Sequence, residues 1–105
     1  MKTAIYVRSA TKDNESLVNQ ERVVRQYLGD DEVYQVYADS CHSGINPDRP
    51  GLRQLLADAV YDRFQSVSVY DETRLSRSLE TNVLLQQRLK KLGIVIKSKG
   101  VDLSS

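Results

Sequence analysis

The chain of 105 residues contains a single cysteine, Cys41, and a single histidine, His42. One cysteine excludes a disulfide within the chain, and the adjacent pair supplies too few ligands for a structural metal site. The apolar residues occur in short clusters that cannot span a bilayer, and the amino-terminal apolar stretch is too short for a signal peptide. We therefore expect a cytoplasmic protein that contains no metal and no cofactor.

The sequence also lacks a large excess of charge of either sign, because 15 Lys and Arg side chains nearly balance 14 Asp and Glu side chains. The formal net charge of +1 gives no strong bulk attraction to nucleic acid. A site for a polyanion must therefore come from arginines that converge locally, which net charge does not reveal. A length of 105 residues fits one domain with a modest core.

The apolar pattern predicts strands and helices that alternate along the chain. Short runs rich in β-branched and aromatic residues predict the strands. Apolar residues that recur every three or four positions predict the helices, and Gly29 and Gly93 provide two of the stops. The predicted elements are a strand at residues 3–7, a helix at 15–28, a strand at 32–38, a helix at 52–60, a strand at 65–70, a helix at 79–92 and a strand at 94–98.

Because right-handed crossovers join successive parallel strands, this order predicts one α/β domain with a mainly parallel sheet and helices on both faces. In the last helix, Val83, Leu85, Leu89 and Leu92 are expected to face the core. Most tyrosines are assigned to the core or its edge, and residues 100–105 are expected to fray. These tyrosines are Tyr27, Tyr34, Tyr37, Tyr61 and Tyr70.

Polar connections follow three of the predicted strands and carry most of the candidate site. In open parallel sheets the ligand crevice lies beyond the carboxyl ends of the strands, so these connections should meet there. Guanidinium groups bind phosphate bidentately and stay protonated, which suits phosphodiester or phosphoryl chemistry. The connections are residues 8–14, 39–51 and 71–78, and their arginines are Arg8, Arg49, Arg74 and Arg77.

Each of these features also has an ordinary structural explanation. A single arginine is commonly a solvated surface residue or part of an exposed ion pair. Asp39, Asp71 and Glu72 could neutralise the arginines in a structural network, and His42 fits a loop residue better than a catalyst. The long connection at residues 39–51 is either functional or a mobile surface loop.

Four short motifs occur in order along the chain. They are Tyr-Val-Arg at residues 6–8, Asp39 with Ser-Gly at 43–44, Asp-Arg-Pro-Gly-Leu at 48–52, and Thr-Arg-Leu-Ser-Arg-Ser at 73–78. In this order and spacing the motifs resemble the catalytic domain of serine recombinases, the resolvase/invertase family, and the large members more than the small resolvases. The resemblance covers about residues 4–98. It implies a three-layer, resolvase-like (flavodoxin-like) α/β domain with strand order 2-1-3-4.

The resemblance also implies a DNA site-specific recombinase. In this family a serine attacks a DNA phosphodiester and forms a 5′-phosphoserine link, and arginines rather than a metal stabilise the transition state. Strand exchange and rejoining follow. Carried over by position, the phosphate-binding residues are Arg8, Arg49, Arg74 and Arg77, the supporting hydroxyl is Ser43, and Tyr6, Asp39, Gly44 and Thr73 line or brace the site.

One departure from the family pattern concerns the nucleophile. The family motif is Tyr-x-Arg-x-Ser, but the position two residues after Arg8 is Ala10, and the serine is Ser9. Side chains alternate along an extended strand, so Tyr6, Arg8 and Ala10 share one side and Ser9 faces the other. Ser9 could serve as the nucleophile only if a bulge or tight turn re-aims it. Thr73 also replaces an aspartate of the small resolvases.

The long dimerisation helix and the separate DNA-binding domain of the family are absent from these 105 residues. We expect DNA as the partner, with a homodimer or tetramer in a full-length protein and a monomeric or loosely associated domain here. The alternative function is a catalytically silent relative that binds DNA or a partner recombinase, which Ala10 favours. A phosphoacceptor domain centred on Asp71 would need an acidic pair where the chain has Arg8 and Ser9.

Overall fold

The computed structural model describes residues 2–9, 14–40, 50–71, 79–99 and 101–102. Its strands form one sheet in the order β2-β1-β3-β4-β5, with β1 to β4 parallel and β5 antiparallel to β4. The predicted order 2-1-3-4 is confirmed. The elements are β1 (Lys2–Ser9), α1 (Asn14–Gln26), β2 (Glu32–Ser40), α2 (Pro50–Val60), β3 (Ser66–Val69), α3 (Leu79–Lys91), β4 (Val95–Ser98) and β5 (Val101–Asp102).

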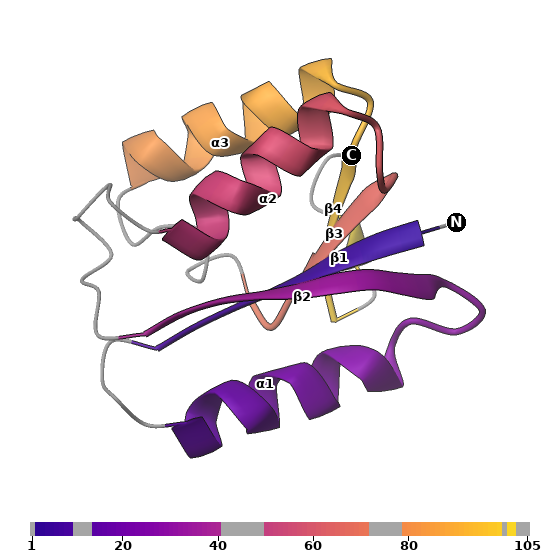
Figure 1. Ribbon diagram of the computed structural model, residues 1–105, viewed down its shortest axis with the longest axis vertical. Helices are drawn as coiled ribbons and strands as arrows, with labels where there is room; N and C mark the ends of the chain where they lie inside the picture. The colour runs from indigo at the N-terminus through magenta and orange to yellow at the C-terminus, as the bar shows by residue number, and fades with distance from the viewer. Residues whose placement is uncertain (1, 10–13, 41–49, 72–78, 100, 103–105) are drawn as a thin grey trace.

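The helices form two layers around the sheet, as predicted: α1 covers one face, and α2 and α3 cover the other (Figure 1). Side chains of β1 alternate between the two layers. Ala4 and Tyr6 belong to the larger core beneath α2 and α3, whereas Ile5 and Val7 pack with Val24 of α1. Because β1 is buried on both faces, it reads as a continuous apolar run and not as an alternating pattern.

Helix α3 buries a narrower stripe than its apolar pattern predicts. Leu89 is fully buried and Leu85 packs at the edge of the core, but Val83 and Leu92 are 43% and 38% exposed. Asn82 takes an inward position, since Asn82, Leu85 and Leu89 follow one another at helical spacings of three and four. The expected inward orientation of Val83 and Leu92 is therefore wrong.

The tyrosines divide between the core and the surface. Tyr37 is buried, and Tyr34 and Tyr70 pack against the two cores. Tyr27 and Tyr61 are 53% and 72% exposed, so the prediction that most of the five lie in the core or at its edge holds for the other three only. Both lie at the last turn of a helix or just beyond it, where the chain leaves the packed layer.

The predicted helix stops at Gly29 and Gly93 are present, with φ angles of 60° and 79° shortly after α1 and α3. The carboxyl-terminal segment was expected to fray, but residues 101–102 form β5, which adds an antiparallel pair to β4. Within the described part of the chain, no helix has the length and apolar content needed to cross a membrane.

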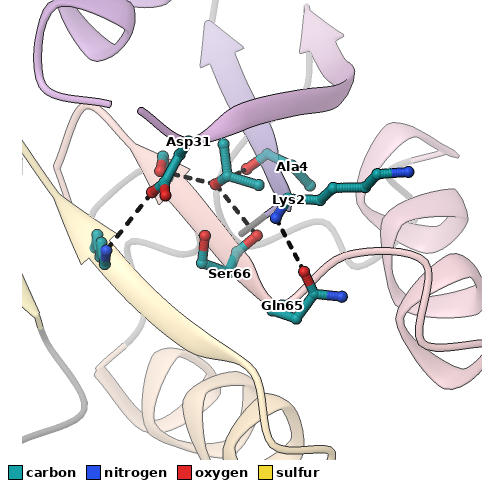
Figure 2. A network of polar contacts seen from close by, with 8 residues as sticks. Lys2, Ala4, Asp31, Gln65 and Ser66 are labelled. Atoms are coloured by element: carbon teal, nitrogen blue, oxygen red, sulfur yellow. Dashed lines mark hydrogen bonds and ion pairs between the residues drawn. The ribbon is translucent and has the colours of Figure 1, made fainter. Parts of the chain in front are cut away.

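Small hydroxyl side chains fill part of the sheet face beside α1, where β1, β3 and β4 meet (Figure 2). The Oγ1 atom of Thr3 lies 3.0 Å from Oγ of Ser68 and donates to the carbonyl oxygen of Ser66 at 3.3 Å. Nearby, Nζ of Lys97 lies 3.7 Å from a carboxylate oxygen of Asp31. Polar contacts therefore replace apolar packing on the part of this face that lies over β3.

Candidate active site

The described part of the candidate site lies at the carboxyl ends of β1 and β2, which end side by side near the start of α2 (Figure 1). The strand register pairs Arg8 with Asp39 and Ser9 with Ser40. Tyr6 lies two residues before Arg8 and is therefore on the same face of β1. The topology thus brings together Tyr6, Arg8 and Asp39, which the sequence separates by up to 33 positions.

The centre of this arrangement is the carboxylate of Asp39, which is 3% exposed. Its Oδ2 atom accepts a hydrogen bond of 2.7 Å from the hydroxyl of Tyr6 and one of 2.9 Å from the backbone N–H of Leu52. Its Oδ1 atom accepts a bond of 2.8 Å from the N–H of Gly51. Asp39 therefore satisfies two of the free donors at the start of α2, where the helix dipole favours a negative charge.

The Pro-Gly-Leu sequence at residues 50–52 explains how α2 can begin so close to β2. Pro50 occupies the first helical position, where its fixed φ suits the helix and its missing N–H is not needed. A Cβ atom on Gly51 would lie 2.6 Å from the carbonyl oxygen of Ala38 and 3.0 Å from Oδ1 of Asp39. Only glycine lets the helix approach the strand closely enough for Asp39 to reach its N–H groups.

Arg8 is 1% exposed and is held through its backbone by Gln20 of α1. The Gln20 side chain donates from Nε2 to the carbonyl oxygen of Arg8 at 2.9 Å and accepts from the N–H of Arg8 at 3.2 Å. The pairing between β1 and β3 ends at Tyr6 and Val69, so the Gln20 amide takes the place of a neighbouring strand beside Arg8.

Sequence reasoning missed Gln20, although a signal for it was present. Leu17, Gln20 and Val24 lie at spacings of three and four on the inward side of α1, and Gln20 is 3% exposed. A polar side chain on the inward stripe of a helix needs buried partners. This position therefore predicts a contact with the sheet, but the sequence does not reveal which strand end it contacts.

Ser9 is the last residue of β1 and is 5% exposed. The only irregularity in the pairing of β1 with β2 lies between Thr3 and Ala4, so the strand continues without a bulge through Ser9. Alternation along the strand places Ser9 on the α1 side with Ile5 and Val7, opposite Tyr6.

The other predicted site residues lie outside the described part of the chain. Among the residues that are described, no group of histidine, cysteine, aspartate and glutamate side chains could hold a metal ion. The site that can be described therefore consists of Tyr6, Arg8, Asp39 and Gln20, with Ser9 beside it. The residues outside the described ranges are Ala10, Ser43, Gly44, Arg49, Thr73, Arg74 and Arg77.

A buried arginine and a tyrosine–aspartate pair at the carboxyl edge of a sheet with this strand order define a resolvase-type α/β domain. The family model “Resolvase, N terminal domain” matches residues 3–104, and the chain belongs to this family. A protein of Bacillus subtilis (strain 168) described as “Putative DNA recombinase” is 34% identical over 95 residues, or 87% of this chain. The chain spans only 19% of that relative.

Solved structures show the same relationship. The N-terminal catalytic domain of TP901-1 integrase superposes with a TM-score of 0.90 at 30% identity, covering 100% of this chain and 84% of that one. A serine recombinase from Sulfolobus solfataricus has a TM-score of 0.79 at 27% identity, covering 95% and 69% of the two chains. The expected resemblance to serine recombinase catalytic domains is confirmed, and so is the resolvase-like fold.

Proposed function

We propose that this domain is the catalytic part of a DNA site-specific recombinase of the serine type. A serine oxygen would attack the phosphorus of a DNA phosphodiester, forming a 5′-phosphoserine bond and breaking the bond to the 3′ oxygen. The serine loses a proton and the leaving 3′ oxygen gains one, so the step is balanced and its reversal rejoins the strand. Family membership and the likeness to recombinase catalytic domains support this proposal.

The observation that carries the proposal is the placement of Arg8 beside Asp39 at the carboxyl edge of the sheet. A guanidinium group stays protonated under all working conditions and matches the geometry of phosphate oxygens. Arg8 is 1% exposed. A fixed charge in a place from which water is excluded strongly stabilises a negative charge that develops beside it. We assign Arg8, with Arg49, Arg74 and Arg77, to binding the phosphate.

We further propose that strand cleavage is impaired. Ala10 occupies the position of the family nucleophile, and a methyl group cannot attack phosphorus. The nearest hydroxyl, Ser9, lies in an extended strand on the side opposite Tyr6, so it would reach the same phosphate only after a change in the backbone. This arrangement favours the second candidate function, a relative that binds DNA or a partner recombinase without cutting.

The test is to measure covalent protein–DNA adducts on supercoiled plasmid DNA with the unmodified chain, Ser9→Ala and Ala10→Ser. We expect few adducts with the unmodified chain and many with Ala10→Ser, because loss of a serine nucleophile costs on the order of a millionfold in a well-studied hydrolase. Adding Arg8→Ala to Ala10→Ser should remove them again.

The other possible outcomes distinguish between the two candidate functions. Adducts that form with the unmodified chain and disappear with Ser9→Ala would make Ser9 the nucleophile and would refute the impairment. DNA binding without adducts in any variant would favour the silent relative. A chain that neither binds DNA nor forms adducts with Ala10→Ser would refute the recombinase proposal.

A further inference from the structure

The turn between β4 and β5 contains a lysine in an unfavourable backbone conformation. Strand β4 ends at Ser98 and β5 begins at Val101, and these two residues pair, so only two residues connect the strands. Lys99 has a φ angle of 47°, in the left-handed region. Such turns favour asparagine and glycine, because a larger side chain costs free energy there. A lysine at this position therefore needs an explanation other than turn formation.

Lys99 is fixed against the end of β3. Its Nζ atom lies 4.1 Å from the ring centroid of Tyr70, which directly follows β3 and packs against the apolar core beneath α1. The hydroxyl of Ser98 donates to the carbonyl oxygen of Tyr70 at 3.2 Å. The turn is thus attached at two points to the residue where the chain leaves β3 towards Arg74 and Arg77.

The strand register places Lys99 at the same edge of the sheet as Arg8. Val69 pairs with both Tyr6 and Ser98, so these three residues form one row across the sheet. Lys99 lies one residue beyond this row on β4, and Arg8 lies two residues beyond it on β1. Strands β1 and β4 are two strand spacings apart, which is at least roughly 10 Å, or about three nucleotide steps of a duplex. This spacing places Lys99 to reach a phosphate a few nucleotide steps from the one that Arg8 binds.

The charge of Lys99 remains available to a ligand. Lys97, on the same strand, is paired with Asp31 at 3.7 Å, whereas Lys99 forms no ion pair with any residue that the structure describes. Lys99 is exposed. Stacking on one face of a ring orients an ammonium group without using its hydrogen-bond donors, which stay free to contact an anion.

We propose that Lys99, oriented by Tyr70, contacts a backbone phosphate of DNA a few nucleotide steps from the phosphate that Arg8 binds. This inference rests on the proposed function, since it assumes that DNA crosses the carboxyl edge of the sheet. The strained turn is then maintained because it holds a positive charge at a fixed place beside the site. The contact is to the phosphate backbone, so it adds affinity and positions the DNA without reading its sequence.

The test compares duplex DNA binding by the unmodified chain, Lys99→Asn, Lys99→Arg and a control, Lys91→Gln. Lys91 is the last residue of α3 and lies shortly before Val95, where β4 begins at the end opposite Ser98 and Lys99. Dissociation constants are measured between about 50 and 200 mM salt, where each phosphate contact contributes about 0.9 to the slope of log K against log salt. We expect Lys99→Asn to reduce the magnitude of this slope by about 0.9. Lys99→Arg and Lys91→Gln should leave the slope unchanged.

Thermal unfolding of the same variants separates a role in binding from a role in folding. Asparagine tolerates the left-handed conformation, so Lys99→Asn should unfold at the same or a higher temperature than the unmodified chain while it binds DNA less strongly. An unchanged slope with Lys99→Asn would overturn this inference and leave the proposed function intact. If the unmodified chain bound no DNA at all, the proposed function would fall, and this inference with it.

Discussion

The hydroxyl of Tyr6 and the carboxylate of Asp39 form a buried hydrogen bond of 2.7 Å between two neighbouring strands. The same carboxylate accepts from the first free N–H groups of α2, at Gly51 and Leu52. One side chain therefore joins β1, β2 and a helix at the edge where Arg8 lies. The described part of the candidate site is held by contacts within the protein itself, so it can be organised before any ligand binds.

Replacing Tyr6 by phenylalanine should destabilise the domain by about 1 kcal/mol. The ring and its packing remain, but Asp39 loses one of the three buried donors that the described residues provide. For a domain of this size the midpoint of thermal unfolding should fall by roughly 4–8 °C. Tyr27→Phe is the matched control, because Tyr27 is 53% exposed and its substitution should change little. Equal midpoints for the two variants would show that the hydrogen bond does not stabilise the fold.

Replacing Gly51 by alanine should also destabilise the domain, although this change within a helix usually stabilises by roughly 0.5–1 kcal/mol. The added methyl group would lie 2.6 Å from the carbonyl oxygen of Ala38, which belongs to the backbone and cannot move freely. We expect a loss of about 1–3 kcal/mol, measured by urea unfolding. Gln54→Ala, at an exposed position of the same helix, serves as the control. A stabilised Gly51→Ala variant would contradict the close approach of α2 and β2.

Replacing Gln20 by leucine should loosen the end of β1 specifically. The N–H and carbonyl of Arg8 would lose their side-chain partners at 3.2 and 2.9 Å, which should cost about 1–3 kcal/mol for each buried group left unsatisfied. Amide hydrogen exchange at Arg8 should accelerate more than exchange at Ile5, which lies deeper in the strand. Gln26→Leu, at the exposed end of α1, should leave both rates unchanged. Uniform acceleration along β1 would instead indicate global destabilisation.

The stability of the domain should fall at alkaline pH because of Tyr37. Burial raises the pKa of the Tyr37 hydroxyl above its usual value, and the hydrogen bond to Asp58 and the negative charge of Asp58 raise it further. Ionisation is therefore easier in the unfolded chain, so stability is fully present below about pH 10 and is lost as pH rises above it.

This pH dependence can be measured as the free energy of unfolding between about pH 8 and 11. Tyr37→Phe should be less stable at pH 8 but should show a smaller decline above about pH 10, because the group that ionises has been removed. Tyr61→Phe is the control, since Tyr61 is 72% exposed. A decline of the same size in Tyr37→Phe would assign the alkaline sensitivity to other groups.

The strands and the mainly parallel sheet were predictable because β1 carries a buried apolar run and because crossover rules leave few topologies for an alternating chain, whereas the strand order followed from the family resemblance. The sequence could not reveal β5, because its two residues carry no recognisable pattern and depend on pairing with β4. The apolar pattern of α3 predicted a buried stripe that is wider than the one in the structure. Val83 and Leu92 look like core residues in the sequence, but only packing against the sheet decides how wide the buried stripe is.

The contacts of the site were harder to predict than its location. Parallel topology explains why Arg8 and Asp39 meet at one edge, but the bond from Tyr6 to Asp39 depends on strand register, which the sequence does not specify. Gln20 was missed because its partners on β1 are backbone groups, which leave no signature in a sequence. The sequence assigned Asp39 to the candidate site, whereas its contacts with the first turn of α2 required the structure.

The central position of β1 has a consequence for synthesis of the protein. Thr3 pairs with Ser66 of β3, so β1 cannot complete its pairing until 63 further residues have been translated. At about 5–20 residues per second, this apolar strand would wait roughly 3–13 seconds with one edge unpaired. A nascent chain that stalls before Ser66 would expose that edge, and an unpaired apolar strand edge is prone to pair with other chains.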